Sequence, residues 1–253
     1  MSNVNKFDGQ VAIVTGASRG IGLAIAERLV QQGARVCITG RKDTALQEAA
    51  LKLGGPNNAL GIAGRSDDLV HQQEVVGTVL DTFGRVDMLV NSTGINPVYG
   101  GLMDLEHAAA RRIFEVNCLA ALSWVQQVHR SWMKEHGGAV VNVASIAGVA
   151  HAPGLGFYGA SKAMLMHLTR QLGVELGPSM RVNAVAPGVV KTKFASALYE
   201  NREEEVSENY PLERLGVPSD VAGAVSFLLS EDASWMTGQT VIVDGGVTLV
   251  GGS

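Results

Sequence analysis

The chain has 253 residues, of which 46% are hydrophobic, and its 20 basic and 24 acidic side chains give a formal net charge of −4. This composition excludes a mainly disordered chain, and the mild acidity argues against a nucleic-acid partner. The length suits one α/β domain with a large core. The two cysteines, Cys37 and Cys118, stand in apolar runs, so we expect buried thiols and no disulfide scaffold.

No export or membrane signal is recognisable in the sequence. The first residues, Met1–Asp8, are polar and lack the apolar stretch of a signal peptide. The longest run without Asp, Glu, Lys or Arg is His136–Ser161, and its His, Pro, Gly and Ser residues do not suit a membrane span. We therefore expect a cytoplasmic protein without a membrane partner.

Short β-branched runs alternate with helical patterns along the whole chain. Strands are expected at Val11–Thr15, Val36–Thr39, Ala59–Ala63 (the weakest), Asp87–Val90, Ala139–Val143, Val182–Val185 and Thr240–Val243. Helices are expected at Ile21–Gln32, Asp43–Leu53, Asp67–Phe83, Leu105–His136, Tyr158–Leu176 and Pro218–Leu229. This alternation indicates βαβ units in a parallel sheet with helices on both faces. We predict one domain that spans residues 1–253.

Two of these helices carry acidic residues at their expected start. Asp43 is expected to cap the second helix, and Asp67 and Asp68 are expected in the first turn of the third. Negative charge is favourable there because the N-terminal end of a helix dipole is positive.

The first strand runs into a glycine-rich turn, Thr15–Gly22, that opens a helix. Backbone N–H groups at such a helix start can hold a pyrophosphate. We expect Gly16 to permit the tight turn, Gly20 to let a phosphate approach, and Gly22 to let helix and strand pack closely. The spacing G-x-x-x-G-x-G differs from the usual dinucleotide fingerprint, and an ordinary strand-to-helix turn is the alternative.

The second strand ends in Thr39–Lys42 and carries no carboxylate at its tip. An acidic residue at this place would bind the ribose 2′-hydroxyl of NAD, whereas an arginine accommodates the 2′-phosphate of NADP. Arg41, together with Arg19 from the glycine loop, is therefore predicted to clamp a 2′-phosphate. The alternative is that Arg41 is a solvated loop charge.

Tyr158 and Lys162 stand four residues apart at a helix start, hence on one face. A free tyrosine has a pKa of about 10, and a fall of about 3 units requires roughly 4 kcal/mol of stabilisation. A lysine ammonium and a cationic nicotinamide nearby can supply this stabilisation. In a reduction, the same tyrosine would protonate the carbonyl oxygen. Ser145 lies 13 residues earlier, after the strand Ala139–Val143, where its hydroxyl can hold the substrate oxygen.

Asn117 interrupts an otherwise apolar helical stripe. The stripe consists of Ile113, Ala120, Trp124 and Val128. A buried amide must find hydrogen-bond partners, so Asn117 is either a structural bridge or part of the site, and the pattern leaves both open.

These motifs together resemble the short-chain dehydrogenase/reductase family of the Tyr-x-x-x-Lys type, over roughly Phe7 to Gly246. The matching residues are Thr15–Gly22, Asn117, Ser145, Tyr158, Lys162, Arg181–Gly188, Thr237–Gln239 and Asp244–Gly246. The resemblance implies a Rossmann-like, doubly wound sheet of seven parallel strands.

The resemblance also implies a catalytic tetrad. Tyr158 is the general acid and base, and Ser145 holds the carbonyl. Lys162 binds the nicotinamide ribose and lowers the pKa of Tyr158, while Asn117 holds a water that relays protons. The implied NADP(H)-binding residues, without any metal, are Gly16, Ser18, Arg19, Gly20, Ile21, Gly22, Arg41, Asn91, Gly94, Tyr158, Lys162, Pro187, Gly188, Val190 and Thr192.

Two positions depart from the family pattern. Asn91–Gly94 reads Asn-Ser-Thr-Gly where Asn-Asn-Ala-Gly is usual, which alters packing rather than chemistry. Arg65 stands where an aspartate usually contacts adenine. A role for this position in the adenine pocket is therefore open, and the alternative is that Arg65 adds to the phosphate clamp.

The glycine loop resembles that of 3-oxoacyl-acyl-carrier-protein reductases. The segments Ala186–Phe194, Arg214–Pro218 and Phe227–Ser234 resemble NADPH-dependent carbonyl and retinol reductases more closely. We therefore expect reduction of a 3-oxoacyl thioester or a related ketone, with a broad carbonyl reductase or alcohol dehydrogenase as the alternative. A non-catalytic nucleotide sensor would have no need of the tetrad.

The resemblance further implies a substrate lid over Phe194–Leu212 and a homotetramer or dimer. The two long helices and the last strand would form the subunit contacts. The partner of the site is expected to be a small-molecule or thioester carbonyl compound.

Overall fold

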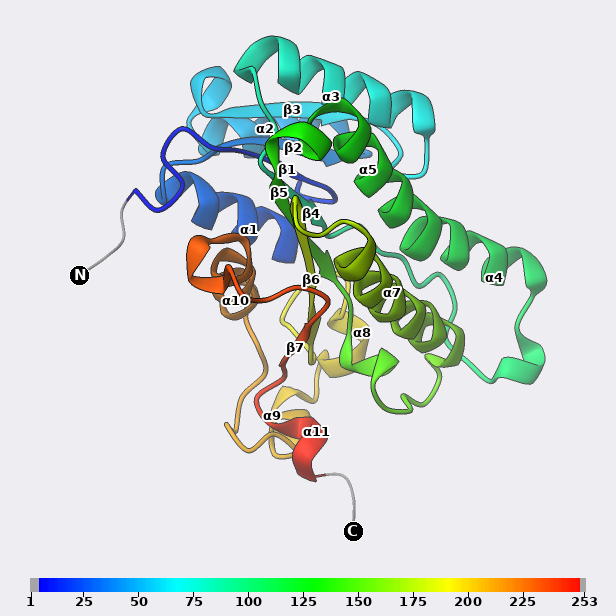
Figure 1. Cartoon of the computed structure of the whole chain (residues 1–253). Coiled ribbons are helices and arrows are strands. Elements are labelled where there is room, and N and C mark those ends of the chain that lie inside the picture. Colours follow the sequence, from blue (N-terminus) through cyan, green and yellow to red (C-terminus); the bar gives the residue numbers. More distant parts are fainter. Residues whose placement is uncertain (1–4, 251–253) are drawn as a thin grey trace.

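The computed structural model describes residues 5–250 and is built on a parallel sheet of seven strands (Figure 1). The strands are β1 (Val11–Val14), β2 (Arg35–Gly40), β3 (Ala59–Ala63), β4 (Met88–Asn91), β5 (Gly138–Val143), β6 (Met180–Pro187) and β7 (Thr240–Val243). Their order is β3-β2-β1-β4-β5-β6-β7. The predicted doubly wound, Rossmann-like sheet is thus confirmed, including the weakest strand.

The strand order reverses between β1 and β4. The chain runs outward from β1 to β2 and β3, then returns to place β4 on the other side of β1. In such sheets, ligands bind at the carboxyl ends of the strands beside this switch point. The glycine loop follows β1, so the fold places it at this edge.

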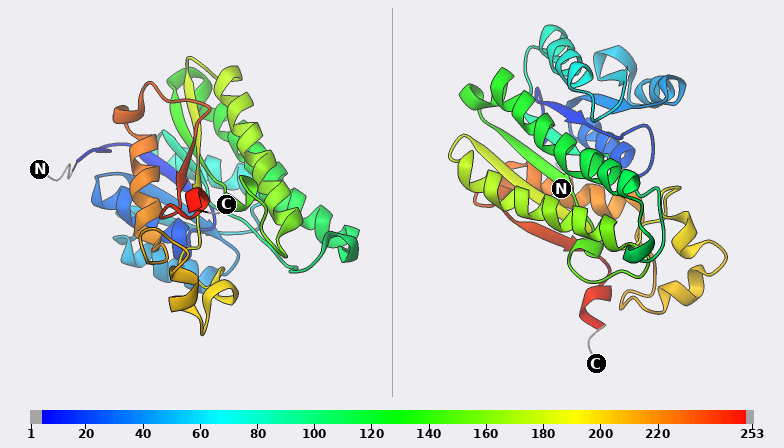
Figure 2. Two further views of the ribbon diagram at one scale, coloured as in Figure 1. Left: turned by 90° about the horizontal axis from the view of Figure 1, so that it is seen from below. Right: turned by 90° about the vertical axis from the view of Figure 1, so that its right-hand side faces the viewer.

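The β-branched runs form strands because both faces of the sheet are covered by helices (Figure 2). Along β1, Ala12 and Val14 pack with helices α1, α2 and α10, whereas Val11 and Ile13 pack with α3 and α5. The helices are α1 (Gly20–Gln31), α2 (Asp43–Lys52), α3 (Leu69–Phe83), α4 (His107–Phe114), α5 (Ala120–Val128), α6 (Lys134–His136), α7 (Gly156–Glu175), α8 (Ser196–Tyr199), α9 (Glu203–Ser207), α10 (Pro218–Leu229) and α11 (Val247–Val250).

The helix predicted at Leu105–His136 follows a continuous helical course from His107, but two π turns divide it. These turns are η3 (Glu115–Leu119) and η4 (His129–Met133). Asn117 lies inside η3, and the apolar stripe around it is buried. A π turn accommodates an extra residue and is frequent at functional sites, which draws attention to this segment.

The start of the third helix differs from the prediction. Helix α3 begins at Leu69, and the Asp68 carboxylate accepts hydrogen bonds from the backbone N–H groups of Val70 and His71. Asp67 lies outside the helix and binds the Arg112 guanidinium through both carboxylate oxygens. One of the two acidic residues therefore caps the helix, and the other joins the loop after β3 to α4.

The remaining differences are small. Asp43 is the first residue of α2 rather than its cap, and β6 is longer than predicted because it continues through Pro187. Both cysteines are buried and free, as expected. Among the helices of residues 5–250, none combines the length and apolar character needed to cross a bilayer.

The cap of α3 yields a stability prediction. Asp68→Ala should lower the free energy of unfolding by about 1 kcal/mol, because two N–H groups at the helix start lose their acceptor. Glu74→Ala, at an exposed position within the same helix, is the matched control and should change it by less than about 0.5 kcal/mol. Thermal or urea unfolding measures both, and equal effects would contradict the capping role.

Candidate active site

The glycine loop adopts the conformation that its sequence predicts. Gly16 has a φ of +66°, a region that favours glycine, and the loop is tied to the end of β2 by a 2.9 Å bond from Ala17 N–H to the Thr39 carbonyl. A Cβ added to Gly22 would lie 2.7 Å from the Gly16 carbonyl oxygen. Helix α1 can therefore pack this closely on the turn only with glycine at position 22.

The start of α1 fits an anionic group. Arg19 occupies the N-cap position, and no side chain of residues 5–250 caps the N–H groups of this 12-residue helix. The loop after β6 faces the same place, since a Cβ added to Gly20 would lie 3.4 Å from the Thr192 methyl group. Free N–H groups and the helix dipole suit a pyrophosphate. The predicted coenzyme residues Gly20 and Thr192 thus lie together.

The end of β2 lies beside the glycine loop and carries positive charge. A Cβ on Gly40 would lie 3.4 Å from the Ser18 hydroxyl oxygen, and the next residue, Arg41, is exposed. Arg41 forms no ion pair within residues 5–250. The nearest acidic residue along the chain, Asp43, accepts a 3.0 Å hydrogen bond from Gln47. This end of the site is therefore suited to an added phosphate.

Arg65 follows β3 and pairs with Asp67 at 2.9 Å. Asp67 also binds Arg112, and these guanidinium groups hold the pKa of its carboxyl well below the ordinary range. A second arginine thus shares the carboxylate with Arg65. A part for Arg65 in the phosphate clamp stays a prediction.

Tyr158 and Lys162 both lie in the first part of α7, and both are buried. The Lys162 ammonium donates a 2.8 Å hydrogen bond to the Val143 carbonyl at the end of β5, and it lies 5.7 Å from the centre of the Tyr158 ring. Ser145 follows the same strand, and its hydroxyl lies near enough to that of Tyr158 to lower the pKa of the tyrosine. The fold therefore brings three members of the predicted tetrad together at the carboxyl edge of β5.

The position of Ser145 depends on a close approach between two elements. Ser145 caps the short helix η5 (Ile146–Gly148), its hydroxyl accepting from the Ala147 N–H at 3.2 Å. A Cβ added to Gly148 would lie 2.6 Å from the Ala163 backbone nitrogen of α7. Glycine at position 148 therefore allows η5 to pack directly against α7, the helix that carries Tyr158.

Burial dominates the acid–base properties of the pair. It raises the pKa of Tyr158 to about 12, a rise that the nearby Ser145 hydroxyl partly offsets. It lowers the pKa of Lys162 to about 8, because the ammonium loses most of its hydration. The expectation that Lys162 lowers the pKa of Tyr158 stays a prediction. Tyr158 keeps its proton at neutral pH, as a proton donor requires.

Asn117 is a structural bridge in this structure. Its amide oxygen accepts from the Ile95 N–H at 2.8 Å, and its nitrogen donates to the Ile95 carbonyl and to the Ser161 hydroxyl, both at 3.0 Å. One of the two possibilities that the sequence left open is thus realised. A relay water at Asn117 stays a prediction.

Asn91 ties the centre of the sheet together. Its amide donates to the Asn142 side chain at 2.9 Å and to the Ala121 carbonyl at 3.1 Å. Gly94, a few residues later, lies close to the lysine, since an added Cβ would be 3.3 Å from the Lys162 nitrogen. Asn91 thus anchors the strand whose following loop faces Lys162.

The other predicted coenzyme residues follow β6. Pro187 ends that strand, and the Gly188 N–H donates to the Val243 carbonyl at 3.0 Å. Val190 is buried, and its carbonyl accepts from the Thr192 hydroxyl at 3.3 Å. Ile21, in the first turn of α1, is half-buried. These positions share the carboxyl edge of the sheet with the glycine loop.

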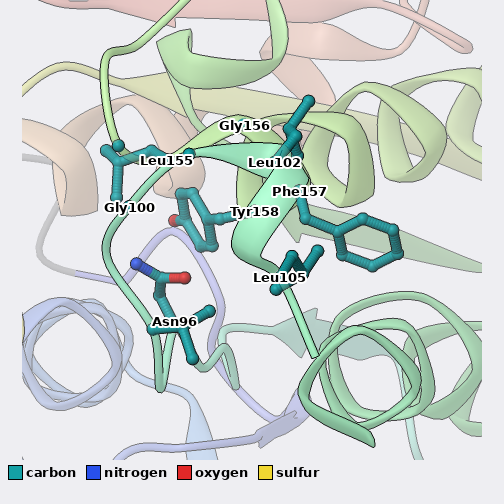
Figure 3. A pocket seen from close by; sticks show the side chains of 11 residues that line it. Asn96, Gly100, Leu102, Leu105, Leu155, Gly156, Phe157 and Tyr158 are labelled. Atoms are coloured by element: carbon teal, nitrogen blue, oxygen red, sulfur yellow. The ribbon is translucent and has the colours of Figure 1, made fainter. Parts of the chain in front are cut away.

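An apolar pocket lies against Tyr158 (Figure 3). It is lined by Asn96, Val98, Gly100, Gly101, Leu102, Leu105, Gly154, Leu155, Gly156, Phe157 and Tyr158. Among the described residues, this lining holds no charged side chain. Phe194, at the start of the predicted lid, places its ring centre 6.1 Å from that of Tyr158. Of these positions, only Tyr158 is predicted as a site residue from the sequence.

The pocket residues were missed because most lie in loops without periodicity. Phe194 was placed at the start of the lid, but nothing in the sequence showed that its ring meets Tyr158. One signal could have identified the other pocket residues. They belong to the segments that follow β4 and precede Tyr158, and both segments lie at the carboxyl edge of the sheet. No group of three metal-binding side chains is found in residues 5–250.

Known proteins resemble this chain along most of its length. Residues 16–248 match the family described as enoyl-(acyl carrier protein) reductase. The chain belongs to the short-chain dehydrogenase/reductase family. It is 42% identical to dehydrogenase/reductase SDR family member 4 of Caenorhabditis elegans, covering 97% of this chain and 98% of that protein. The mouse protein of the same name is 39% identical, covering 96% and 88%.

Solved structures of the short-chain dehydrogenase/reductase family agree with the fold. A short-chain dehydrogenase/reductase from Brucella melitensis, described as a glucose/ribitol dehydrogenase, superimposes with a TM-score of 0.91 at 32% identity, covering 96% of this chain and 98% of that one. The family consists of oxidoreductases that use a nicotinamide coenzyme. The uncapped start of α1 and the glycine cradle fit such a coenzyme.

The contact between η5 and α7 yields a prediction for this site. Gly148→Ala should push η5 away from α7 and move Ser145, because the new Cβ would clash with the Ala163 nitrogen. We expect kcat to fall at least about tenfold, since small misplacements of reacting groups are costly. Gly77→Ala, where an added Cβ meets nothing within 4 Å, is the control and should keep full activity. Steady-state kinetics compares the two, and an unchanged kcat for Gly148→Ala would contradict this role.

Proposed function

We propose that the protein is an NADPH-dependent reductase that converts a ketone, in a 3-oxoacyl thioester or a free carbonyl compound, to an alcohol. The observation that carries the proposal is the buried Tyr158, close to the Ser145 hydroxyl and beside Lys162, at the wall of an apolar pocket. The free positive charge of Arg41 at the end of β2 supports NADP(H) over NAD(H).

The residues of the chain divide the work of the reduction. When bound, the reduced nicotinamide supplies the hydride to the carbonyl carbon. The Ser145 hydroxyl holds the carbonyl oxygen, and Tyr158 donates its proton to that oxygen as negative charge develops there. Lys162, held by the Val143 carbonyl, keeps a positive group beside the tyrosine and favours the tyrosinate that results.

The lining of the pocket supports the proposal that the substrate carries an apolar substituent. Leu102, Leu105 and Leu155 line it, and the Phe194 ring closes toward Tyr158 from the lid. Walls of this kind favour an apolar substituent next to the ketone. Turnover of an acetoacetyl thioester, compared with a panel of free ketones and diketones, separates a fatty-acid-type reductase from a general carbonyl reductase.

We further propose that the protein acts in the cytoplasm as a homotetramer or dimer. Exposed apolar side chains support subunit contacts at the places expected from the sequence. They are Leu119 beside α5, Val174 on α7, Trp235 before β7 and Ile242 on β7. Sedimentation velocity separates monomer, dimer and tetramer.

The first functional prediction concerns the proton donor. Tyr158→Phe should abolish turnover and leave the NADPH dissociation constant within about twofold, because it removes the acidic hydroxyl and keeps the ring. Tyr99→Phe, at an exposed tyrosine, is the control and should keep wild-type turnover. Coenzyme oxidation followed by absorbance gives the rates, and tryptophan fluorescence gives the binding constants. Turnover that survives in Tyr158→Phe would overturn the mechanism.

The second concerns the coenzyme. Arg41→Ala should raise the dissociation constant of NADPH at least about tenfold, because a charge-assisted bond worth about 1.5–3 kcal/mol is lost. The constant for NADH should stay the same, which makes NADH an internal control. Arg130→Ala, at an exposed arginine of η4, controls for the change of net charge. An unchanged affinity for NADPH would remove Arg41 from the site.

A further inference from the structure

Ser161 lies between the two catalytic residues Tyr158 and Lys162 on α7, and its side chain is buried. Its hydroxyl donates a 2.7 Å hydrogen bond to the Tyr158 carbonyl and accepts one of 3.0 Å from the Asn117 amide. A serine hydroxyl has one donor and two acceptor sites. The one hydroxyl hydrogen of Ser161 therefore bonds the backbone carbonyl of Tyr158. One of its two acceptor sites bonds the Asn117 side chain of η3.

The Asn117 amide extends this connection to the loop after β4. Both N–H groups and the oxygen of the amide form hydrogen bonds. The Ile95 N–H donates to the Asn117 oxygen, and the Ile95 carbonyl accepts from the Asn117 nitrogen. That loop also carries Gly94, which lies against the Lys162 nitrogen. Ser161 therefore stands in a chain of hydrogen bonds that links the loop, the π turn and the helix around the tyrosine–lysine pair.

The neighbouring residue of the π turn contacts the same position. The Cys118 thiol donates to the Ser161 carbonyl, with the sulfur 3.2 Å from the oxygen. Two successive residues of η3 thus contact Ser161, one at its side chain and one at its backbone. The π turn makes this possible because it widens the helix locally.

We propose that Ser161 is a positioning residue for catalysis. Its hydroxyl fixes the first turns of α7 against η3, and this holds the Tyr158 hydroxyl and the Lys162 ammonium at the geometry of proton transfer. It touches neither substrate nor coenzyme in this role. Without the hydroxyl, a buried N–H of Asn117 lacks an acceptor, and the contact between η3 and α7 relaxes.

The same helix provides a matched control. Thr169 is also buried, its hydroxyl donates a 2.8 Å hydrogen bond to the Leu165 carbonyl, and it accepts one of 2.9 Å from the Asn142 amide. Its hydrogen bonding is thus the same as that of Ser161, two turns further from Tyr158. Removal of either hydroxyl leaves one buried asparagine N–H unpaired, at a comparable cost in stability.

The experiment compares Ser161→Ala, Ser161→Thr and Thr169→Val in the full chain. For each, kcat and KM are measured with NADPH and the panel ketone that the wild type reduces fastest, together with the NADPH dissociation constant and the melting temperature. We expect kcat to fall about tenfold in Ser161→Ala, with KM and the dissociation constant within about twofold. Ser161→Thr, which retains a hydroxyl able to bond the preceding turn, should recover kcat to within about threefold.

Thr169→Val should lower the melting temperature as much as Ser161→Ala does and keep kcat within about twofold. An unchanged kcat in Ser161→Ala, or an equal loss in the two deletion variants, would overturn the proposal. The comparison of Ser161→Ala with Thr169→Val tests the positioning role whether or not Ser161→Thr folds. A wild type that reduces the panel with NADH alone contradicts the proposed coenzyme, and the same comparison is then made with NADH.

Discussion

The hydrogen bond from the Lys162 ammonium to the Val143 carbonyl is the interaction on which the site depends. A buried ammonium is costly unless it is hydrogen-bonded, and this bond places it at the carboxyl end of β5. Because Lys162 and Tyr158 share one helical face, anchoring the lysine also fixes where the tyrosine stands. The packing of η5 on α7 then brings Ser145 to the same point.

The coenzyme end of the site depends on the sheet rather than on side chains. The reversal of strand order beside β1 leaves room at the carboxyl edge, and the glycine loop fills it with backbone N–H groups. The loop after β6, which carries Thr192, closes that space from the other side. One edge of one sheet therefore holds both the predicted anion cradle and Tyr158, the proposed proton donor, which is the arrangement that a hydride transfer between two bound molecules needs.

The sequence predicted most of this arrangement because its signals are local. The strand runs, the glycine spacing and the tyrosine–lysine pair each lie within a few residues, and the structure has them as expected. The start of α3 was misjudged because Asp67 and Asp68 look alike in the sequence, while only tertiary contacts make one a cap and the other the partner of Arg112. Burial raises the pKa of Tyr158, and no spacing in the sequence reveals that burial. The wall formed by Phe194 and the bonds of Ser161 join distant segments and leave no periodic pattern.

The π turn η3 also sets the rotational phase between α4 and α5. An α-helix advances about 100° per residue, and a π turn absorbs one residue more than an α-turn does. With that residue, Arg112 on α4 meets Asp67 while Trp124 on α5 faces the core. In a chain one residue shorter in this segment, α4 would be rotated by about a quarter turn relative to α5. Either the ion pair between Arg112 and Asp67 would then break, or the Trp124 indole would leave the core. The ion pair of Arg112 and the burial of Trp124 therefore constrain the length of this segment.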